Sequence, residues 1–127
     1  MTRFLSRGIP FSAVYAINDG IAMGAYHALR ARGLRVPEDV SLMGSDDSPL
    51  SEHFEVPLTS MSLDKLQFGL EAVNLLLARM QDVGSDAVPR LPRTILLEPK
   101  LVRRCSVARC SKSHPAKFMI PHTRKRG

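Results

Sequence analysis

Long apolar runs are missing from this sequence. No stretch approaches the roughly 20 apolar residues that a transmembrane helix requires, and the first seven residues lack the continuous apolar segment of a secretory signal. With 44% hydrophobic and 24% charged residues, the 127-residue chain has the composition of an ordinary soluble domain. We therefore expect one small domain in the cytoplasm, without a membrane partner.

Cysteine is scarce as well. Only Cys105 and Cys110 occur, close together in a polar and basic setting, and in a reducing compartment such residues are more often free thiols than a disulfide. Together with His114 and His122 they give the spacing C-x4-C-x3-H-x7-H, which misses the C-x2-4-C and H-x3-5-H pairs typical of zinc sites. We expect no metal site and no cofactor.

Acidic residues are absent from the end of the chain. Residues 1–99 carry nine Lys or Arg and twelve Asp or Glu, whereas residues 100–127 carry nine Lys or Arg and no acid. The net charge of +6 therefore comes from the tail, and the body is mildly acidic. An interpretation of the whole chain as a nucleic-acid-binding domain would depend on this tail alone.

The first half of the chain has the pattern of a strand, a helix and a second strand. Residues 11–17 are rich in β-branched and aromatic side chains, and they end at Asn18-Asp19-Gly20, where Asp19 is expected to cap the helix that follows. Apolar residues then recur at helical spacing until Gly33 stops the helix. Residues 40–43 form a short apolar run typical of a buried strand. Such a β-α-β connection is almost always parallel and right-handed.

Polar side chains follow both of these strands. Gly44 is expected to turn the backbone after the second strand, and Asp46 and Asp47 come next; Asn18 has the equivalent place after the first strand. Because carboxyl ends of parallel strands meet at one edge of a sheet, Asn18 and Asp46 should face the same crevice. An amide that donates and accepts, with a carboxylate that only accepts, suits a hydroxyl-rich ligand such as a sugar or nucleoside. The corner lacks the glycine-rich backbone and cations of a phosphate site.

The second half predicts one long helix between extended segments. A helical turn is expected over residues 48–54, extended chain over 58–62, and a helix from the N-cap Asp64 that residues 84–86 close. Residues 94–97 and 101–102 are expected to be two short strand segments. From Ser106 onward periodicity is lost, which predicts a disordered basic tail over residues 106–127.

Simpler roles for the same residues stay open. Asp46 or Asp47 could cap the following turn, and Asn18 could tie down its own corner. His27 and His53 have no serine or cysteine placed beside them as a nucleophile, so we expect surface histidines and no catalysis. A magnesium-dependent receiver or phosphatase, which uses adjacent aspartates at a strand end, stays a further alternative. It would also need a third acid and a lysine at other strand ends, whereas Lys65 opens a helix.

Four stretches in register carry a resemblance to a known family. They lie at residues 16–25, 33–41, 44–47 and 57–60, and they include Asn18-Asp19-Gly20 and Gly44-Ser45-Asp46-Asp47. Taken together, they resemble the effector-binding domain of the LacI/GalR family of bacterial repressors, over roughly residues 3–105. The resemblance implies a partial periplasmic-binding-protein-like (type I) fold, an α/β fold with a parallel sheet and flanking helices. It also implies chain crossovers between two subdomains near residues 62–63 and 98–100.

The resemblance also implies roles for single residues. Asn18 and Asp46 fall where the family places polar contacts to the effector. Ser45, which we also expect to contact the ligand, replaces an aromatic residue common beside that acid. Leu63 stands where many members have a ligand-contacting Gln. Phe54 matches a position that members bury at their dimer contact.

The partners follow from the same resemblance. They are a small-molecule effector, expected to be a carbohydrate, a second copy of the chain in a homodimer, and DNA only through an N-terminal helix-turn-helix outside this chain. Residues 1–105 would then be the C-terminal portion of a sensing domain whose N-terminal part is missing, which would leave the apolar stripe of the second helix without its partner. A fragment of an exported periplasmic sugar-binding protein is the alternative.

Overall fold

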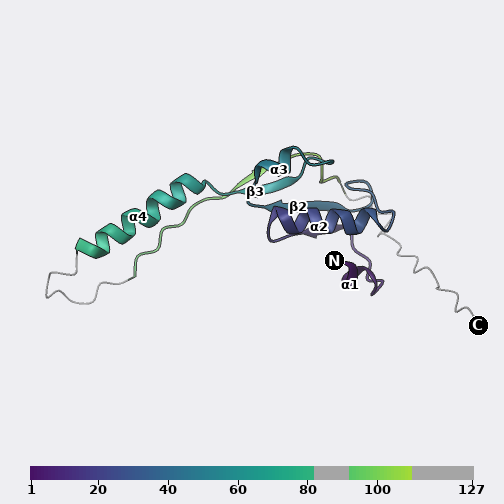
Figure 1. Ribbon diagram of the computed structural model, residues 1–127, viewed down its shortest axis with the longest axis horizontal. Coiled ribbons are helices and arrows are strands. Elements are labelled where there is room, and N and C mark those ends of the chain that lie inside the picture. The colour runs from purple at the N-terminus through teal and green to yellow at the C-terminus, as the bar shows by residue number, and fades with distance from the viewer. Residues whose placement is uncertain (82–91, 110–127) are drawn as a thin grey trace, which may run out of the picture.

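A computed structural model describes residues 1–81 and 92–109 of the chain (Figure 1). In chain order, the elements are α1 (Thr2–Leu5), β1 (Ala13–Tyr15), α2 (Asp19–Arg30), β2 (Ser41–Ser45), α3 (Pro49–Glu52), β3 (Thr59–Ser62), α4 (Lys65–Gln81) and β4 (Lys100–Val102). The α/β fold predicted from the sequence is confirmed.

The four strands form one sheet in the order β1-β2-β3-β4. β1 pairs with β2 and β2 with β3 in parallel, whereas β4 joins the far edge antiparallel to β3. The predicted parallel β-α-β unit is therefore present, with α2 as its helix. In this register Tyr15 lies beside Met43, and Ser45 lies beside Met61. The chain segments after β1 and β2 consequently leave the sheet at the same edge.

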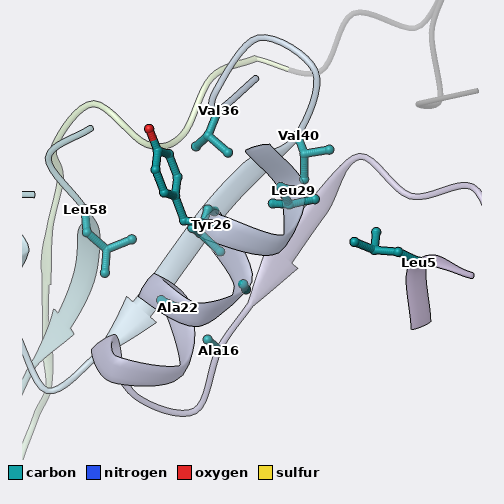
Figure 2. Packing of buried hydrophobic residues seen from close by; sticks show 10 residues of the cluster. Leu5, Ala16, Ala22, Tyr26, Leu29, Val36, Val40 and Leu58 are labelled. Atoms are coloured by element: carbon teal, nitrogen blue, oxygen red, sulfur yellow. The ribbon is translucent and has the colours of Figure 1, made fainter. Parts of the chain in front are cut away.

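The core lies between α2 and the sheet. Its buried members come from α1, α2, β2 and the segments around them: Leu5, Ala16, Ala22, Ala25, Tyr26, Leu29, Val36, Val40, Leu42 and Leu58. Figure 2 shows the side chains of α2 meeting this cluster from one face of the helix. The amphipathic helix α2 thus packs its apolar face against the sheet.

The helix α4 stands apart from this core (Figure 1). None of its residues is buried, and its apolar side chains remain accessible, with Leu66 74% and Leu77 50% exposed. Its predicted N-cap is confirmed, because Oδ1 of Asp64 accepts from the backbone N–H of Gln67 at 2.9 Å. The predicted stop at residues 84–86 lies outside the described residues. Within residues 1–81 and 92–109, no helix is long and apolar enough to cross a membrane.

Two boundaries differ from those expected. Residues 94–97 form no strand, because no neighbouring strand pairs with them. Side chains that favour strands do not by themselves provide hydrogen-bond partners for the backbone N–H and C=O groups. The packed body also continues past residue 105. Ser106 is buried. Its Oγ accepts a hydrogen bond from the N–H of Thr59 (2.8 Å) and donates one to the carbonyl of Leu42 (2.6 Å). The start of the tail is thus tied to two strands, and residues 110–127 lie outside the described part.

Candidate functional site

Two polar corners lie side by side at the carboxyl edge of the sheet. Asn18 follows β1 by three residues, and Asp46 directly follows β2. Because these strands are adjacent, parallel and in register at Tyr15 and Met43, the two corners share one edge. The structure therefore brings together the two residues that the sequence singles out as ligand contacts.

Asn18, and not Asp19, caps α2. Its backbone is extended (φ −151°, ψ 168°), and its Oδ1 accepts from the backbone N–H of Ile21 at 2.8 Å. The cap uses only the carbonyl half of the amide. Within the described residues the two Nδ2 hydrogens have no protein acceptor, so this side chain can both hold the corner and donate to a ligand.

Asp46 has an unusual backbone conformation. Its φ is +100°, in the left-handed region that L-residues rarely adopt, and the sheet holds it there. Its N–H donates to the carbonyl of Met61 (2.9 Å), and its carbonyl accepts from Nζ of Lys65 (2.8 Å). The carboxylate itself is exposed and forms no hydrogen bond with other described residues. The backbone of Asp46 is thus fixed, and its side chain is available.

Asp47 has a structural role that differs from the expected cap. Ser48 is the N-cap residue of α3, so neither aspartate caps that turn. Asp47 also has positive φ (+46°), and its Oδ1 forms an ion pair with Nη1 of Arg104 at 2.8 Å. The two side chains are only 20% and 16% exposed. Asp47 therefore anchors the loop and does not compete with Asp46 for a ligand.

Asp19 is a buried carboxylate surrounded by donors. Its Oδ2 accepts from the N–H of Ser48 (2.7 Å) and from Oγ of Ser51 (2.6 Å), and its Oδ1 accepts from Oγ of Ser60 (2.6 Å). Burial favours the neutral acid, but the hydrogen bonds from the three serines outweigh it and lower the pKa of Asp19 below its ordinary value. The expectation that Asp19 caps α2 is wrong, because these non-local donors take up its carboxylate.

Gly44 does not make the turn after β2. The strand continues through it to Ser45, and the turn follows at Asp46 and Asp47. A Cβ at position 44 would overlap Oδ1 of Asp19 and approach Cδ2 of Leu58 to 2.9 Å. Glycine is needed here because the buried carboxylate passes directly over the strand.

The other residues that the resemblance singles out lie in different places. Ser45 ends β2 and is half-buried. Leu63 lines an apolar groove of about 330 Å³ beside Phe68 of α4 and Ile95. Phe54 is half-buried against α2, with its ring centroid 4.7 Å from that of Tyr26. In the described part of the chain, no group of three or more His, Cys, Asp or Glu is arranged to hold a metal ion.

Sequence reasoning missed the residues that hold the site. They are Ser51, Ser60 and Arg104, which reach the two corners from α3, β3 and the segment after β4. A single signal could have indicated them: a buried aspartate needs hydroxyl or cationic partners, and serines occur in the later segments that form α3 and β3. Which serines are chosen depends on the fold.

Comparisons with known proteins agree with this architecture. The family profile of the periplasmic binding protein-like domain matches residues 3–107. The chain therefore belongs to the periplasmic binding protein-like domain family, in the form found in LacI/GalR regulators.

Particular relatives can be named. The HTH-type transcriptional repressor PurR of Haemophilus influenzae is 40% identical over 109 residues, which are 84% of this chain and 31% of the repressor. The lac repressor dimer bound to operator and an anti-inducer has a TM-score of 0.72 and 32% identity, over 84% of this chain and 35% of that one. The regulator CelR in complex with cellobiose has a TM-score of 0.71 and 37% identity, over 83% and 31%. The chain spans about a third of the length of these proteins.

Proposed function

We propose that this chain is the effector-sensing part of a LacI/GalR-like transcription regulator and that Asn18 and Asp46 bind a hydroxyl-rich small molecule. The observation that carries the proposal is the pairing of an amide and a carboxylate at one sheet edge, each with its backbone fixed and its ligand-facing atoms unused within the described residues. Polar groups held rigid before binding lose little entropy when a ligand arrives.

The two side chains complement a pair of neighbouring hydroxyls. The carboxylate of Asp46 accepts hydrogen bonds from two hydroxyl groups, and Nδ2 of Asn18 donates to the oxygen of one of them. Ser45 lies next to Asp46 in sequence and adds a third polar group at this edge. Sugars and the ribose of nucleosides both present such diols, and CelR, a structural neighbour, binds the sugar cellobiose.

In the whole protein, binding would be linked to DNA. A ligand that favours one arrangement of the sensing domain changes the affinity for operator DNA by linkage, through a helix-turn-helix outside this chain. The lac repressor was solved as a dimer on its operator, which supports a homodimeric regulator here. Phe54 is then the residue we place near the dimer contact, packed from behind by Tyr26.

A calorimetric titration of the 127-residue chain tests the ligand site. The probes are D-ribose, cellobiose and adenosine, and an affinity in about the millimolar range corresponds to a few hydrogen bonds and little else. Asn18→Asp keeps an oxygen for the helix cap but removes the Nδ2 donor, and Asp46→Asn halves the acceptors while tolerating positive φ. We expect both to weaken binding about fivefold or more.

A control separates site effects from charge effects. Glu38 is an exposed carboxylate in another turn, so Glu38→Gln removes the same charge as Asp46→Asn but leaves the site intact. We expect this variant to bind as the unmodified chain does. Absence of binding to all three probes, or equal effects of Glu38→Gln and Asp46→Asn, would contradict the proposed site.

A further inference from the structure

The buried carboxylate of Asp19 links the two corners that carry the candidate ligand contacts. Asp19 is next to Asn18 at the start of α2, and it is 1% exposed, so it cannot itself contact a ligand. All of its hydrogen-bond donors lie on later segments, at Ser48, Ser51 and Ser60. The first corner is therefore joined to the second one through buried polar groups.

Ser60 differs from the other donors, because its second partner is a backbone amide next to Asp46. Its Oγ donates to Oδ1 of Asp19 at 2.6 Å, and the same oxygen accepts from the backbone N–H of Asp47 at 3.1 Å. That N–H belongs to the peptide group that follows Asp46. On the other side of Asp46, its own N–H donates to the carbonyl of Met61. Neighbouring residues of β3 thus fix both peptide groups that flank Asp46.

This arrangement explains how an unfavourable conformation persists. Two consecutive residues with positive φ would relax if nothing held them, since such conformations cost about 1–3 kcal/mol each. The hydroxyl of Ser60 is oriented, because its only hydrogen goes to the carboxylate of Asp19 and its lone pairs face the loop. The negative charge on Asp19 strengthens this chain of hydrogen bonds.

We propose that Ser60, oriented by Asp19, is a positioning residue that holds the peptide after Asp46 so that the Asp46 carboxylate faces the ligand. The inference rests on the proposed function for its biological meaning. Its physical content, the hydrogen bond by which one buried hydroxyl holds the Asp47 amide, can be measured without any ligand.

Ser51 provides a matched control within the same cluster. Its Oγ also donates to Asp19 at 2.6 Å, and both serines are 0% exposed. Ser51 contacts the Ser48 hydroxyl, and within the described residues it forms no hydrogen bond with Asp46 or Asp47. Ser51→Ala and Ser60→Ala therefore remove the same group from the same carboxylate, and only Ser60→Ala releases the N–H of Asp47.

The experiment compares these two variants in the full chain. Hydrogen exchange of the Asp47 amide is followed by NMR, and calorimetry gives the dissociation constant for whichever of D-ribose, cellobiose and adenosine binds the unmodified chain best. We expect Ser60→Ala to speed exchange at Asp47 about tenfold or more and to weaken binding roughly fivefold. Ser51→Ala should change each by less than about twofold, although both variants unfold at lower urea concentrations.

Each other result has a definite meaning. Unchanged exchange at Asp47 in Ser60→Ala, or equal losses of binding in both variants, would overturn the positioning role. If the unmodified chain binds none of the probes, the proposed function fails, and the exchange comparison decides the positioning role alone. If Ser60→Ala does not fold, Ser60→Cys replaces it, because a thiol fills the site but is a weak donor and acceptor.

Discussion

Replacing Gly44 by alanine tests the packing of the buried carboxylate. Alanine normally stabilises a strand relative to glycine by about 0.5–1 kcal/mol, because glycine loses more backbone freedom on folding. At this position, however, the added Cβ would occupy the place of Oδ1 of Asp19 and would lie 2.9 Å from Cδ2 of Leu58. Both neighbours are buried, so neither can move into solvent.

The expected destabilisation combines two effects. Forcing a methyl group into a packed interior costs about 1–3 kcal/mol. Displacing Oδ1 of Asp19 weakens its hydrogen bond from Ser60, and a hydrogen bond to a charged group contributes about 1.5–3 kcal/mol. After the glycine effect is subtracted, we expect Gly44→Ala to lower the free energy of unfolding by about 2–5 kcal/mol.

Urea unfolding followed by circular dichroism measures this change. Gly24→Ala is the control, because Gly24 lies inside α2 and an added Cβ would meet no atom within 4 Å apart from its chain neighbours and the backbone of its own helix. Alanine there should stabilise by about 0.5–1 kcal/mol. In an Asp19→Ala background the penalty of Gly44→Ala should shrink, since the clashing oxygen is gone. The reasoning is refuted if Gly44→Ala is neutral, or if its penalty is the same in both backgrounds.

Three further predictions concern charge and exposure. Because the pKa of Asp19 is lowered in the folded protein, the ionised carboxylate stabilises the fold fully above the ordinary pKa of 3.8. This stabilisation is lost as the pH falls through the folded-state pKa. Asp19→Asn should therefore flatten the pH dependence of the urea midpoint below pH 3.8, and parallel curves for the variant and the unmodified chain would contradict this. Arg104→Gln should lower the free energy of unfolding by about 2–4 kcal/mol, because its ion pair with Asp47 is mostly buried. Arg35→Gln breaks an exposed ion pair and should change the free energy of unfolding by less than about 1 kcal/mol. Equal losses of the two variants in urea unfolding would contradict this difference. The exposed apolar side chains of α4 should make the chain self-associate. In sedimentation, a Leu70→Ser/Leu77→Ser variant should therefore associate less than the unmodified chain. A monomeric unmodified chain with a concentration-independent thermal transition would disprove the predicted self-association.

Local pattern was sufficient to predict the β-α-β unit. Period-3.6 apolar residues, the polar break at Asn18 and the stop at Gly33 all agree with the packing of α2 on β2. The common edge of Asn18 and Asp46 followed from the parallel connection alone. That edge is a property of topology, so no side-chain detail was needed to find it.

The inner side of the site could not be predicted in the same way. Asn18 and Asp19 are equally good caps by residue type, and the choice is made by serines up to 41 residues away in sequence that bind Asp19. The role of Gly44 depends on the same distant carboxylate. Residues 94–97 have strand-forming side chains but no strand beside them, which is again a tertiary circumstance.

An NMR titration of the 127-residue chain with D-ribose, cellobiose and adenosine is the most direct test of the ligand site. If a hydroxyl-rich molecule binds between the two corners, the largest shifts will be at the Nδ2 hydrogens of Asn18 and the amides of Asp46 and Asp47, and Asp46→Asn will abolish most of them. Shifts confined to α4, or no shifts with any probe, would contradict the account.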